Sequence, residues 1–275
     1  YVHVLNANGV ELSGWPKQPI PNVPQNTQAT KISTSDLNGD GKKEIVFPIV
    51  QWDYAQVNRP VIFAYKSDGT QLWSYQPPFV EKKGMGDKDD IVTGDIDSDG
   101  NIEIVYFRSG KGRVGMDANY GFVLNKDGIP QTELVIPLNM AQFDGTLAPQ
   151  IALGDINGDG KLEIIIVGSE VDSNLPFTPP EDYIELRVFA LEYNRADVTG
   201  FPINTEYKDV AWPMIADIDN NGGYDIISSL SNARGNFVTN PVYAWNNQGD
   251  LLEGWPIYLY SNFPADDNNT KKERK

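Results

Sequence analysis

The chain has no cysteine and only one histidine among its 275 residues. The lack of thiols excludes disulfides, zinc–thiolate sites and cysteine nucleophiles. The single histidine is His3, so a Ser-His-Asp triad would have to be built at the first residues of the sequence. These absences argue against the enzyme classes that depend on a thiol or an imidazole.

Basic residues and long apolar runs are also scarce. The 22 Lys and Arg residues are outnumbered by 38 Asp and Glu, which gives a formal net charge of -16. Nucleic acid is therefore not an expected partner, because phosphate neutralisation needs clustered Lys and Arg. No run approaches the roughly 18 apolar residues of a membrane-spanning helix, and the first residues lack a charged-then-apolar signal pattern. We therefore expect a mature or trimmed sequence with no membrane span.

The residues that are abundant favour β structure. Hydrophobic residues make up 40% of the chain, and 25 Gly and 19 Pro provide many turns between short elements. The hydrophobic share argues against disorder. A chain of this length buries a sizeable core, either as one large domain or as several modules.

One nine-residue frame with oxygen-bearing side chains occurs four times. Its first, third and fifth positions are Asp or Asn, its sixth is Gly, and its ninth is Glu or Asp. The copies start 59, 60 and 62 residues apart, so the frame belongs to a repeating structural unit. The candidate metal ligands are Asp36, Asn38, Asp40, Glu44, Asp95, Asp97, Asp99, Glu103, Asp155, Asn157, Asp159, Glu163, Asp217, Asp219, Asn221 and Asp225.

This pattern suits a hard cation that prefers oxygen, and we predict Ca²⁺ at up to four sites. Alternating oxygen ligands, a glycine that turns the backbone and a distal carboxylate are what calcium requires. An EF-hand is not expected, because its bidentate Glu stands at position twelve between two helices. The frames hold thirteen of the carboxylates, so bound cations would offset much of the negative charge. We interpret the metal as a brace between strands and not as a catalyst.

Strand-like runs and hairpin signals surround each frame. Apolar runs such as Ile151–Leu153 and Ile164–Val167 precede and follow it, and each is too short for a helix. Asn-Gly and Asp-Gly sequences recur further along each unit, which predicts tight hairpins whose two central residues both have positive φ. Each unit of about 60 residues thus predicts four antiparallel strands, the blade of a β-propeller.

The repeat predicts an all-β propeller with about four and a half four-stranded blades, part of a larger ring whose remaining blades would be partners within the same protein. A small closed ring with one half-blade is the alternative. Propeller repeats are expected over residues 1–262, followed by a polar, disordered tail at 263–275. Trp15, Phe201 and Trp255 hold equivalent positions at the hairpin ends and are expected to pack between blades. The predicted half-blade and blades are residues 2–16, 27–76, 86–137, 147–203 and 209–258.

These repeats resemble the calcium-binding FG-GAP repeats of the integrin alpha-chain propeller and the related bacterial VCBS-type repeats. The resemblance covers residues 1 to about 260 and rests on the four frames and the Gly-Trp-Pro hairpin ends. It implies that the metal loops lie on one face of the disc and that ligands dock on the opposite face. Departures from the family pattern, where a neutral or shorter oxygen ligand stands, are Asn38, Asn157, Asn221 and Asp225.

We predict a non-catalytic, extracellular or cell-surface module for binding or adhesion. Calcium loops of weak affinity work only where calcium is abundant, which means outside the cell. The partner is expected to be a glycan or an extracellular protein, recognised by variable loops opposite the calcium loops. Aromatic and basic side chains in these loops are the candidate ligand residues: Trp52, Asp53, Tyr54, Arg108, Lys111 and Arg113.

Two other functions remain open from the sequence. The chain could be the propeller portion of a secreted, lyase-like enzyme that degrades polysaccharides, since calcium-bearing propellers similar to this one occur in some lyases. Acidic residues outside the frames, including Glu181 and Asp182, also leave a carboxylate pair for glycoside hydrolysis open. The chain could instead be a purely structural spacer in a surface protein.

Overall fold

The computed structural model describes residues 1–20, 28–29, 31–50, 60–77, 88–109, 119–134, 150–171, 184–205, 209–210, 213–231 and 240–259. Within these ranges the regular elements are eighteen β-strands. No described helix is long and apolar enough to cross a membrane. The all-β prediction is confirmed, and the predicted tail at 263–275 lies outside the described residues.

The strands form four antiparallel sheets that follow one another along the chain. Each sheet is a blade with four strand positions; in the first and last blades the inner position is split into two short strands. Blade 1 contains β1 (Gln28–Ala29), β2 (Ser33–Ser35), β3 (Glu44–Val50), β4 (Pro60–Tyr65) and β5 (Gln71–Tyr75). Blade 2 contains β6 (Lys88–Gly94), β7 (Glu103–Ser109), β8 (Asn119–Leu124) and β9 (Pro130–Leu134). Blade 3 contains β10 (Gln150–Gly154), β11 (Glu163–Val171), β12 (Ile184–Leu191) and β13 (Ile203–Thr205), and blade 4 contains β14 (Asp209–Val210), β15 (Met214–Ala216), β16 (Asp225–Ser231), β17 (Asn240–Trp245) and β18 (Ile257–Leu259).

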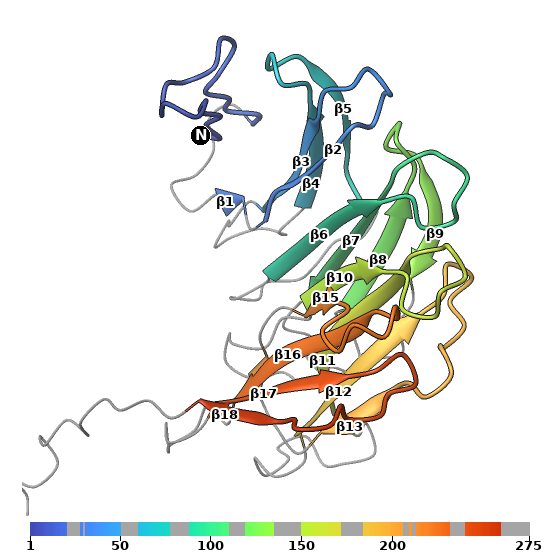
Figure 1. The fold of residues 1–275 in the computed structure, drawn as a ribbon. Coiled ribbons are helices and arrows are strands. Elements are labelled where there is room, and N and C mark those ends of the chain that lie inside the picture. Colours follow the sequence, from blue (N-terminus) through green and yellow to red (C-terminus); the bar gives the residue numbers. More distant parts are fainter. Residues whose placement is uncertain are drawn as a thin grey trace, which may run out of the picture.

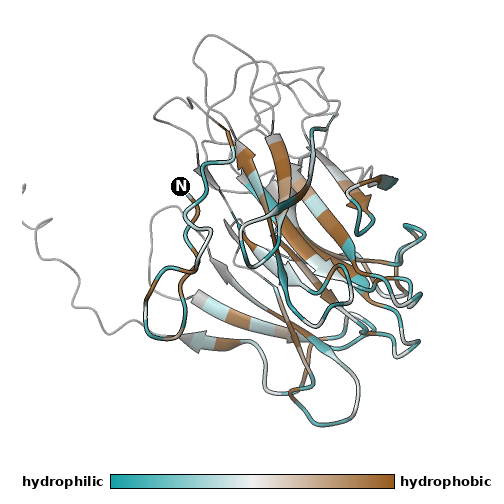
Figure 2. Cartoon of the chain, turned by 90° about the horizontal axis from the view of Figure 1, so that it is seen from above, coloured by the Kyte–Doolittle hydropathy of each residue, from teal (hydrophilic) through white to brown (hydrophobic). Residues whose placement is uncertain are grey.

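Both faces of the inner blades are buried, which explains their continuous apolar runs. Along β11, Ile164 and Ile166 pack in one cluster with blade 2, whereas Ile165 and Val167 pack in another with blade 4. Successive side chains point to opposite faces of a strand, so a strand between two blades needs an apolar residue at every position. Figure 2 shows brown, hydrophobic bands concentrated in the strands, whereas teal is most frequent in the loops.

The blades form a curved row in sequence order (Figure 1). Residues 1–20 form a hairpin at one end, joined by the bridges Val2↔Lys17 and Leu5↔Glu11. Val2 and Trp15 pack in one hydrophobic cluster with β3 and β4. The four predicted blades are therefore present, and this hairpin lies where the half-blade was predicted.

The hairpin turns differ from the predicted type. In the first hairpin the Gly9 N–H donates to the Asn6 carbonyl at 2.9 Å, and the Asn6 N–H donates to the Val10 carbonyl at 2.8 Å. Only the glycine has positive φ, at 74°. The loop is thus a type I turn followed by a left-handed residue, one residue longer than the expected two-residue turn. In blade 3 this position is taken by Arg195, with φ of 74°.

A buried carboxylate on blade 2 connects three blades. Asp90, on β6, forms an ion pair with Lys31 of blade 1 and accepts the Ile151 N–H of blade 3 at 2.8 Å. Burial raises the pKa of Asp90, and the nearby Lys31 ammonium opposes this rise. The inner strands are therefore held together by polar contacts as well as by apolar packing.

Candidate metal centre

The four nine-residue frames form the loops between the first two strand positions of each blade. They connect β2 to β3, β6 to β7, β10 to β11 and β15 to β16. Strand direction alternates, so these loops and the hairpin turns that follow β4, β8, β12 and β17 lie at the same edge of the sheets. The frames thus have one structural position in all four blades.

The aspartate at the first position organises the loop backbone. Asp155 Oδ1 accepts the N–H groups of Gly158 at 2.7 Å and Asp159 at 3.1 Å, and its Oδ2 accepts the Gly160 N–H at 2.9 Å. The bonds to the fifth and sixth positions recur in every frame, with Asp36, Asp95 and Asp217 as acceptors. The loop is therefore folded around this carboxylate.

The third and fifth side chains follow the same scheme. In each frame, one oxygen of the third residue accepts the N–H of the fifth, and one oxygen of the fifth accepts the N–H of the seventh. In the third frame, Asn157 Oδ1 accepts from Asp159 at 2.9 Å, and Asp159 Oδ1 accepts from Lys161 at 2.8 Å. These bonds orient the side chains, and in the fourth frame the second oxygen of Asp219 also accepts a hydrogen bond from Asn221 Nδ2 at 2.9 Å.

The carboxylate at the ninth position is buried in every blade. The exposed fractions of Glu44, Glu103, Glu163 and Asp225 are 1%, 5%, 0% and 1%. One oxygen of each accepts the backbone N–H of the apolar residue at position two, as Ile156 donates to Glu163 Oε2 at 2.8 Å. A buried carboxylate is unfavourable unless a positive charge or donors compensate it.

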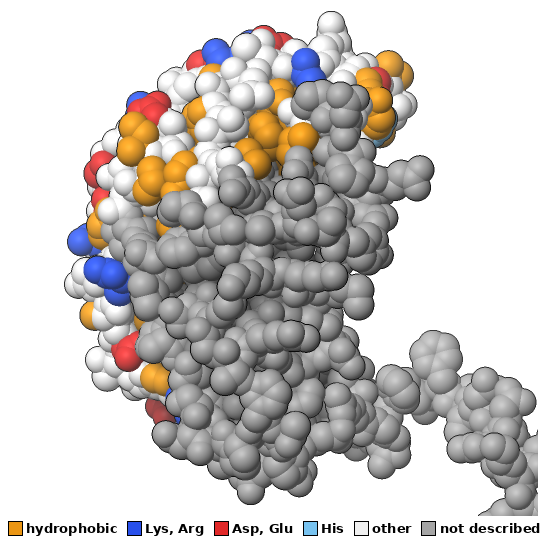
Figure 3. Space-filling view, turned by 180° about the vertical axis from the view of Figure 1, so that it is seen from behind, with side chains coloured by type: hydrophobic (Ala, Val, Ile, Leu, Met, Phe, Trp, Pro, Cys, Tyr) orange, Lys and Arg blue, Asp and Glu red, His pale blue; other side chains and the backbone are white. Residues whose placement is uncertain are grey.

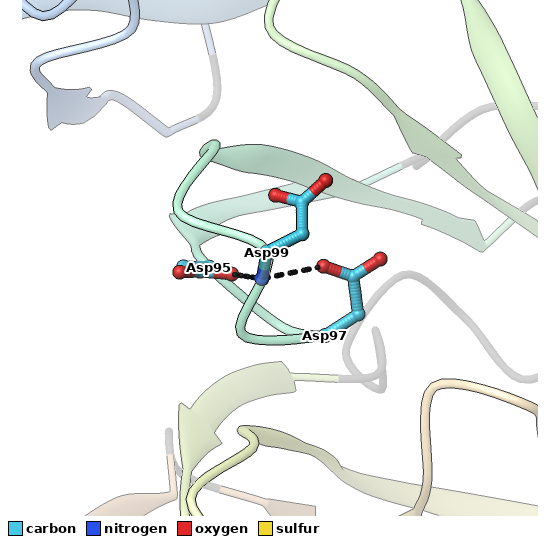
Figure 4. A group of neighbouring side chains, drawn as sticks. All are labelled: Asp95, Asp97 and Asp99. Carbon is cyan, nitrogen blue, oxygen red and sulfur yellow. Dashed lines mark hydrogen bonds between the residues drawn. The ribbon is translucent and has the colours of Figure 1, made fainter.

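Three frames bring their carboxylates together. The grouped residues are Asp95, Asp97 and Asp99; Asp155, Asp159 and Glu163; and Asp217, Asp219 and Asp225, with one ligand atom of each within 4.8 Å of the others. Figure 4 shows the group at Asp95, held by the Asp99 N–H. In the third frame, the buried Oε1 of Glu163 has no hydrogen-bond partner within the described residues.

The raised pKa values of the buried carboxylates also indicate that their negative charge is poorly compensated. Burial raises the pKa of Glu103 to about 7, and Asp97, Asp99 and Asp95 add to the rise, against the Ile96 N–H. Burial also raises the pKa of Glu163 to about 7, with a smaller contribution from Glu192 and Asp159. Burial raises the pKa of Asp225 as well. A divalent cation would compensate each of these groups.

The residues present fit a calcium ion. The grouped ligands are carboxylate oxygens that stand close to amide oxygens, with no nitrogen or sulfur ligand, which is the donor set of a hard cation. The unpartnered Glu163 Oε1 adds a buried acceptor that a cation would satisfy. Three acidic groups could therefore bind metal ions.

The first frame differs, although its ligand side chains are those of the third. Asn38 Nδ2 donates to Glu44 Oε1 at 3.1 Å, so the amide occupies the second oxygen of the buried carboxylate. In the third frame, the corresponding Asn157 Nδ2 donates to Glu192 Oε1 at 3.0 Å, on the hairpin turn of the same blade. Among the described residues, the carboxylates of the first frame do not form a group like the other three.

Two loop positions were not among the predicted site residues. The fourth residue has positive φ in every frame, at Gly39, Ser98, Gly158 and Asn220. The residue type indicated a positive φ at Gly39, Gly158 and Asn220, because Gly and Asn tolerate this conformation. The serine at position 98 did not indicate it. The second position matters through its backbone N–H and its buried side chain, and only its constant apolar character could have indicated this.

The predicted ligand residues lie mostly outside the described chain. Trp52, Asp53, Tyr54, Lys111 and Arg113 fall outside it. Arg108 lies on β7 in register with Asp89 and Tyr120, at the opposite end of the strand from Glu103. Figure 3 shows acidic and basic side chains interspersed along the rim of the described surface.

Comparison with known proteins gives a structural similarity but no match of sequence. No family model matches the chain, and no curated protein sequence matches it. The chain is similar to a crystal structure of an exo-beta-1,3-galactanase from Phanerochaete chrysosporium with beta-1,3-galactotriose, at a TM-score of 0.41 and 10% identity. The match covers 94% of this chain and 52% of that one, so this chain spans about half its length. The repeated propeller-type sheets implied by the FG-GAP and VCBS resemblance are present in the strand pairing itself, whereas membership of those families stays a prediction.

Proposed function

We propose that the chain is an extracellular, calcium-stabilised binding or adhesion module built from propeller-type blades. Calcium binding is supported above all by the buried Glu163 carboxylate, which is grouped with Asp155 and Asp159 and has one oxygen without a hydrogen-bond partner among the described residues. The same loop scheme recurs in all four blades, which favours a bracing role for the ion over a single reactive centre.

Calcium titration tests this part directly. Isothermal titration of the chelator-treated chain should show at least three calcium equivalents, one for each acidic group. Magnesium should bind more weakly, because it demands near-octahedral geometry and loses its water reluctantly. Absence of calcium binding at millimolar concentration would contradict the proposal.

The binding part rests on the division of the blades into two edges. The metal loops and hairpin turns brace one edge, and Arg108 lies toward the other edge of β7. Binding residues concentrate on loops that a rigid scaffold holds. We therefore assign recognition of a glycan or an extracellular protein to the segments at 51–59 and 110–118, where Trp52 and Tyr54 supply aromatic anchors.

A glycan array and a panel of extracellular proteins, probed with the calcium-loaded chain, test recognition. Binding that is lost in Trp52→Ala or Arg108→Ala, while calcium stoichiometry is unchanged, supports the proposal. Depolymerisation of an acidic polysaccharide by the isolated chain would favour the enzymatic alternative. No binding, together with an unchanged calcium-dependent fold, would favour a structural spacer.

A further inference from the structure

The blades are joined by a contact that is repeated along the row. A hairpin end of one blade packs against the hairpin turn of the next. The Trp15 indole N–H donates to the Ser67 carbonyl at 2.9 Å, and the Trp73 indole N–H donates to the Lys126 carbonyl at 2.8 Å. Both acceptors hold the second position of their turns.

Glycines allow the closest approach at this contact. A Cβ at Gly14 would lie 1.9 Å from the Asp68 carbonyl oxygen, and one at Gly200 would lie 1.8 Å from the Gln248 carbonyl oxygen. Asp68 and Gln248 each hold the third position of the hairpin turn in the following blade. The Gly-aromatic-Pro sequence thus docks against a turn in the same way at the first and the last joint of the row.

Blade 4 carries a further copy of this hairpin end, and no turn among the described residues packs against it. Gly254, the counterpart of Gly14 and Gly200, has no atom within 4 Å of an added Cβ. Trp255 is half-buried, whereas Trp15 and Phe201 are buried. Within the described residues, the Trp255 indole N–H has no hydrogen-bond acceptor. The prediction that Trp255 packs between blades is therefore not confirmed within the described residues.

A cleft lined by both apolar and acidic residues lies beside Trp255. It has a volume of about 410 Å³ and is lined by Ile218, Asp219, Leu252, Glu253 and Trp255. Ile218 is 38% exposed, although its counterparts Leu37, Ile96 and Ile156 are 4%, 0% and 1% exposed. Those counterparts pack in the clusters that join each blade to the next. We call this surface of blade 4, made by the residues that line the cleft together with Gly254, the receiving face.

The first hairpin carries the complementary element, which likewise has no partner in the part of the chain that the structure describes. Gly9, which ends the turn Asn6–Gly9, has no atom within 4 Å of an added Cβ, whereas Gly69, Gly128 and Gly249 contact the preceding blade. Leu5, just before the turn, is 56% exposed. Its counterparts are buried, with exposed fractions of 5%, 0%, 7% and 4% for Tyr65, Leu124, Leu191 and Trp245.

The two free elements stand at opposite ends of the row, at the hairpin before β1 and at β18 (Figure 1). They do not meet within one molecule, but they can meet between two. We propose that the chain associates head to tail, with the Asn6–Gly9 turn of a second copy seated on the receiving face of blade 4. By analogy with the internal joints, the Trp255 N–H donates to the Ala7 carbonyl, and Gly254 faces the Asn8 carbonyl.

Charge fits this pairing. At the first joint, an acidic turn residue, Asp68, lies in a turn that packs against Lys17 on the preceding hairpin. At the free ends, the receiving face carries Asp219 and Glu253, and the turn carries neutral Asn8 at the position of Asp68. An acidic residue at position 8 would meet like charges, which destabilises such an interface. The interface is heterologous, so copies either close into a ring or extend as a filament.

Sedimentation velocity of the calcium-loaded chain, from micromolar to near-millimolar concentration, tests the proposal. The parent should show mass that rises with concentration, and Trp255→Ala and Asn8→Asp should each weaken association at least tenfold. Asn8→Asp is conservative for folding, because Asp68 and Asp127 already hold this turn position. Ile129→Ala, at an exposed residue on the second blade, is the control and should associate as the parent does. Unchanged thermal unfolding establishes that each variant is folded.

Mixing experiments separate head-to-tail association from other modes. Trp255→Ala and Leu5→Glu should each be monomeric alone, and their mixture should form a one-to-one dimer, because each retains one intact surface. Glu253→Lys should restore association of Asn8→Asp. A parent that stays monomeric at every concentration overturns the proposal. So does association that Trp255→Ala weakens but Leu5→Glu and Asn8→Asp leave unchanged, since that result indicates a symmetric contact.

Discussion

The first and third metal loops have the same ligand side chains but different arrangements. Both carry Asp, Asn, Asp and Glu at the ligand positions, yet only the third gathers its three carboxylates within 4.8 Å. The hydrogen bond of one amide distinguishes the two loops. Asn157 Nδ2 donates a hydrogen bond to Glu192, whereas Asn38 Nδ2 donates one to Glu44. Blade 1 has Lys66 at the position of Glu192, so its turn offers the amide no acceptor side chain. The residues around a loop therefore decide how well identical ligands are arranged for an ion.

Calcium removal should have the largest effect. A ligand that binds only the folded state adds about 2.7 kcal/mol per site at a hundredfold excess over its Kd. In a chain of this size, this corresponds to about 5–10 °C of thermal stability for each site. Differential scanning calorimetry with calcium, with magnesium and with chelator measures the change. An unchanged melting temperature in chelator would contradict calcium bracing.

Removing the ninth carboxylate should distinguish the two loops. We expect Glu163→Gln to abolish one calcium equivalent and about 2–3 kcal/mol of the calcium-dependent stability. In chelator the variant should be at least as stable as the parent, because it removes a buried charge whose Oε1 has no donor. Glu44→Gln is the matched variant and should lose less calcium-dependent stability. Urea unfolding with and without calcium measures both; equal losses would remove the distinction.

Exchanging the turn residues should transfer the difference between the loops. Glu192→Lys gives blade 3 the turn residue of blade 1, and it should free the Asn157 amide to bind Glu163. We expect the third site to weaken by about 1 kcal/mol, or about fivefold, the contribution of one hydrogen bond. Lys66→Glu should strengthen the first site. Site-resolved NMR during calcium titration follows each loop, and unchanged affinities in both variants would show that the turn residue is not the cause.

The calcium-free chain should also show a pH dependence that comes from the buried carboxylates. The folded-state pKa of Glu103 and Glu163 is raised to about 7 from 4.5, so the folded state binds more protons than the unfolded state between these values. Stability in chelator should therefore fall as pH rises from about 5 to 7. With calcium the fall should disappear, because the ion stabilises the charged carboxylates. Chemical unfolding across this range tests the sign, and Glu163→Gln should reduce the slope.

Much of the fold could be read from local pattern. Short apolar runs on both sides of each frame predicted paired strands, and the period of about 60 residues predicted four similar sheets. The turn type was wrong, because the pairing of Asn6 with Gly9 and Val10 adds a residue that the Asn-Gly signal does not reveal. The blade 3 turn was harder to recognise, since Arg195 adopts the backbone conformation that glycine holds elsewhere.

The candidate metal ligands were also recognisable, because calcium chemistry dictates oxygen side chains at fixed spacing. The supporting contacts were not. Asn157 and Glu192 are 35 residues apart, and only the folding of blade 3 brings them together. The burial of Glu163 likewise depends on strand packing. Ser98 contacts the Gly160 carbonyl of the next loop, a contact between blades that spacing within one frame does not contain.

The repeated residues, namely the oxygen ligands, the turning glycines and the apolar strands, were recognisable from the chain, because each follows from chemistry within a few residues. Which copies of a repeated element pack against another blade became clear only from the fold. Gly14 and Gly254 lie in the same Gly-Trp-Pro sequence, yet one packs against a turn and the other faces open space. Burial and the arrangement of the ligands depend on contacts with the neighbouring blade, which lie far apart in the sequence.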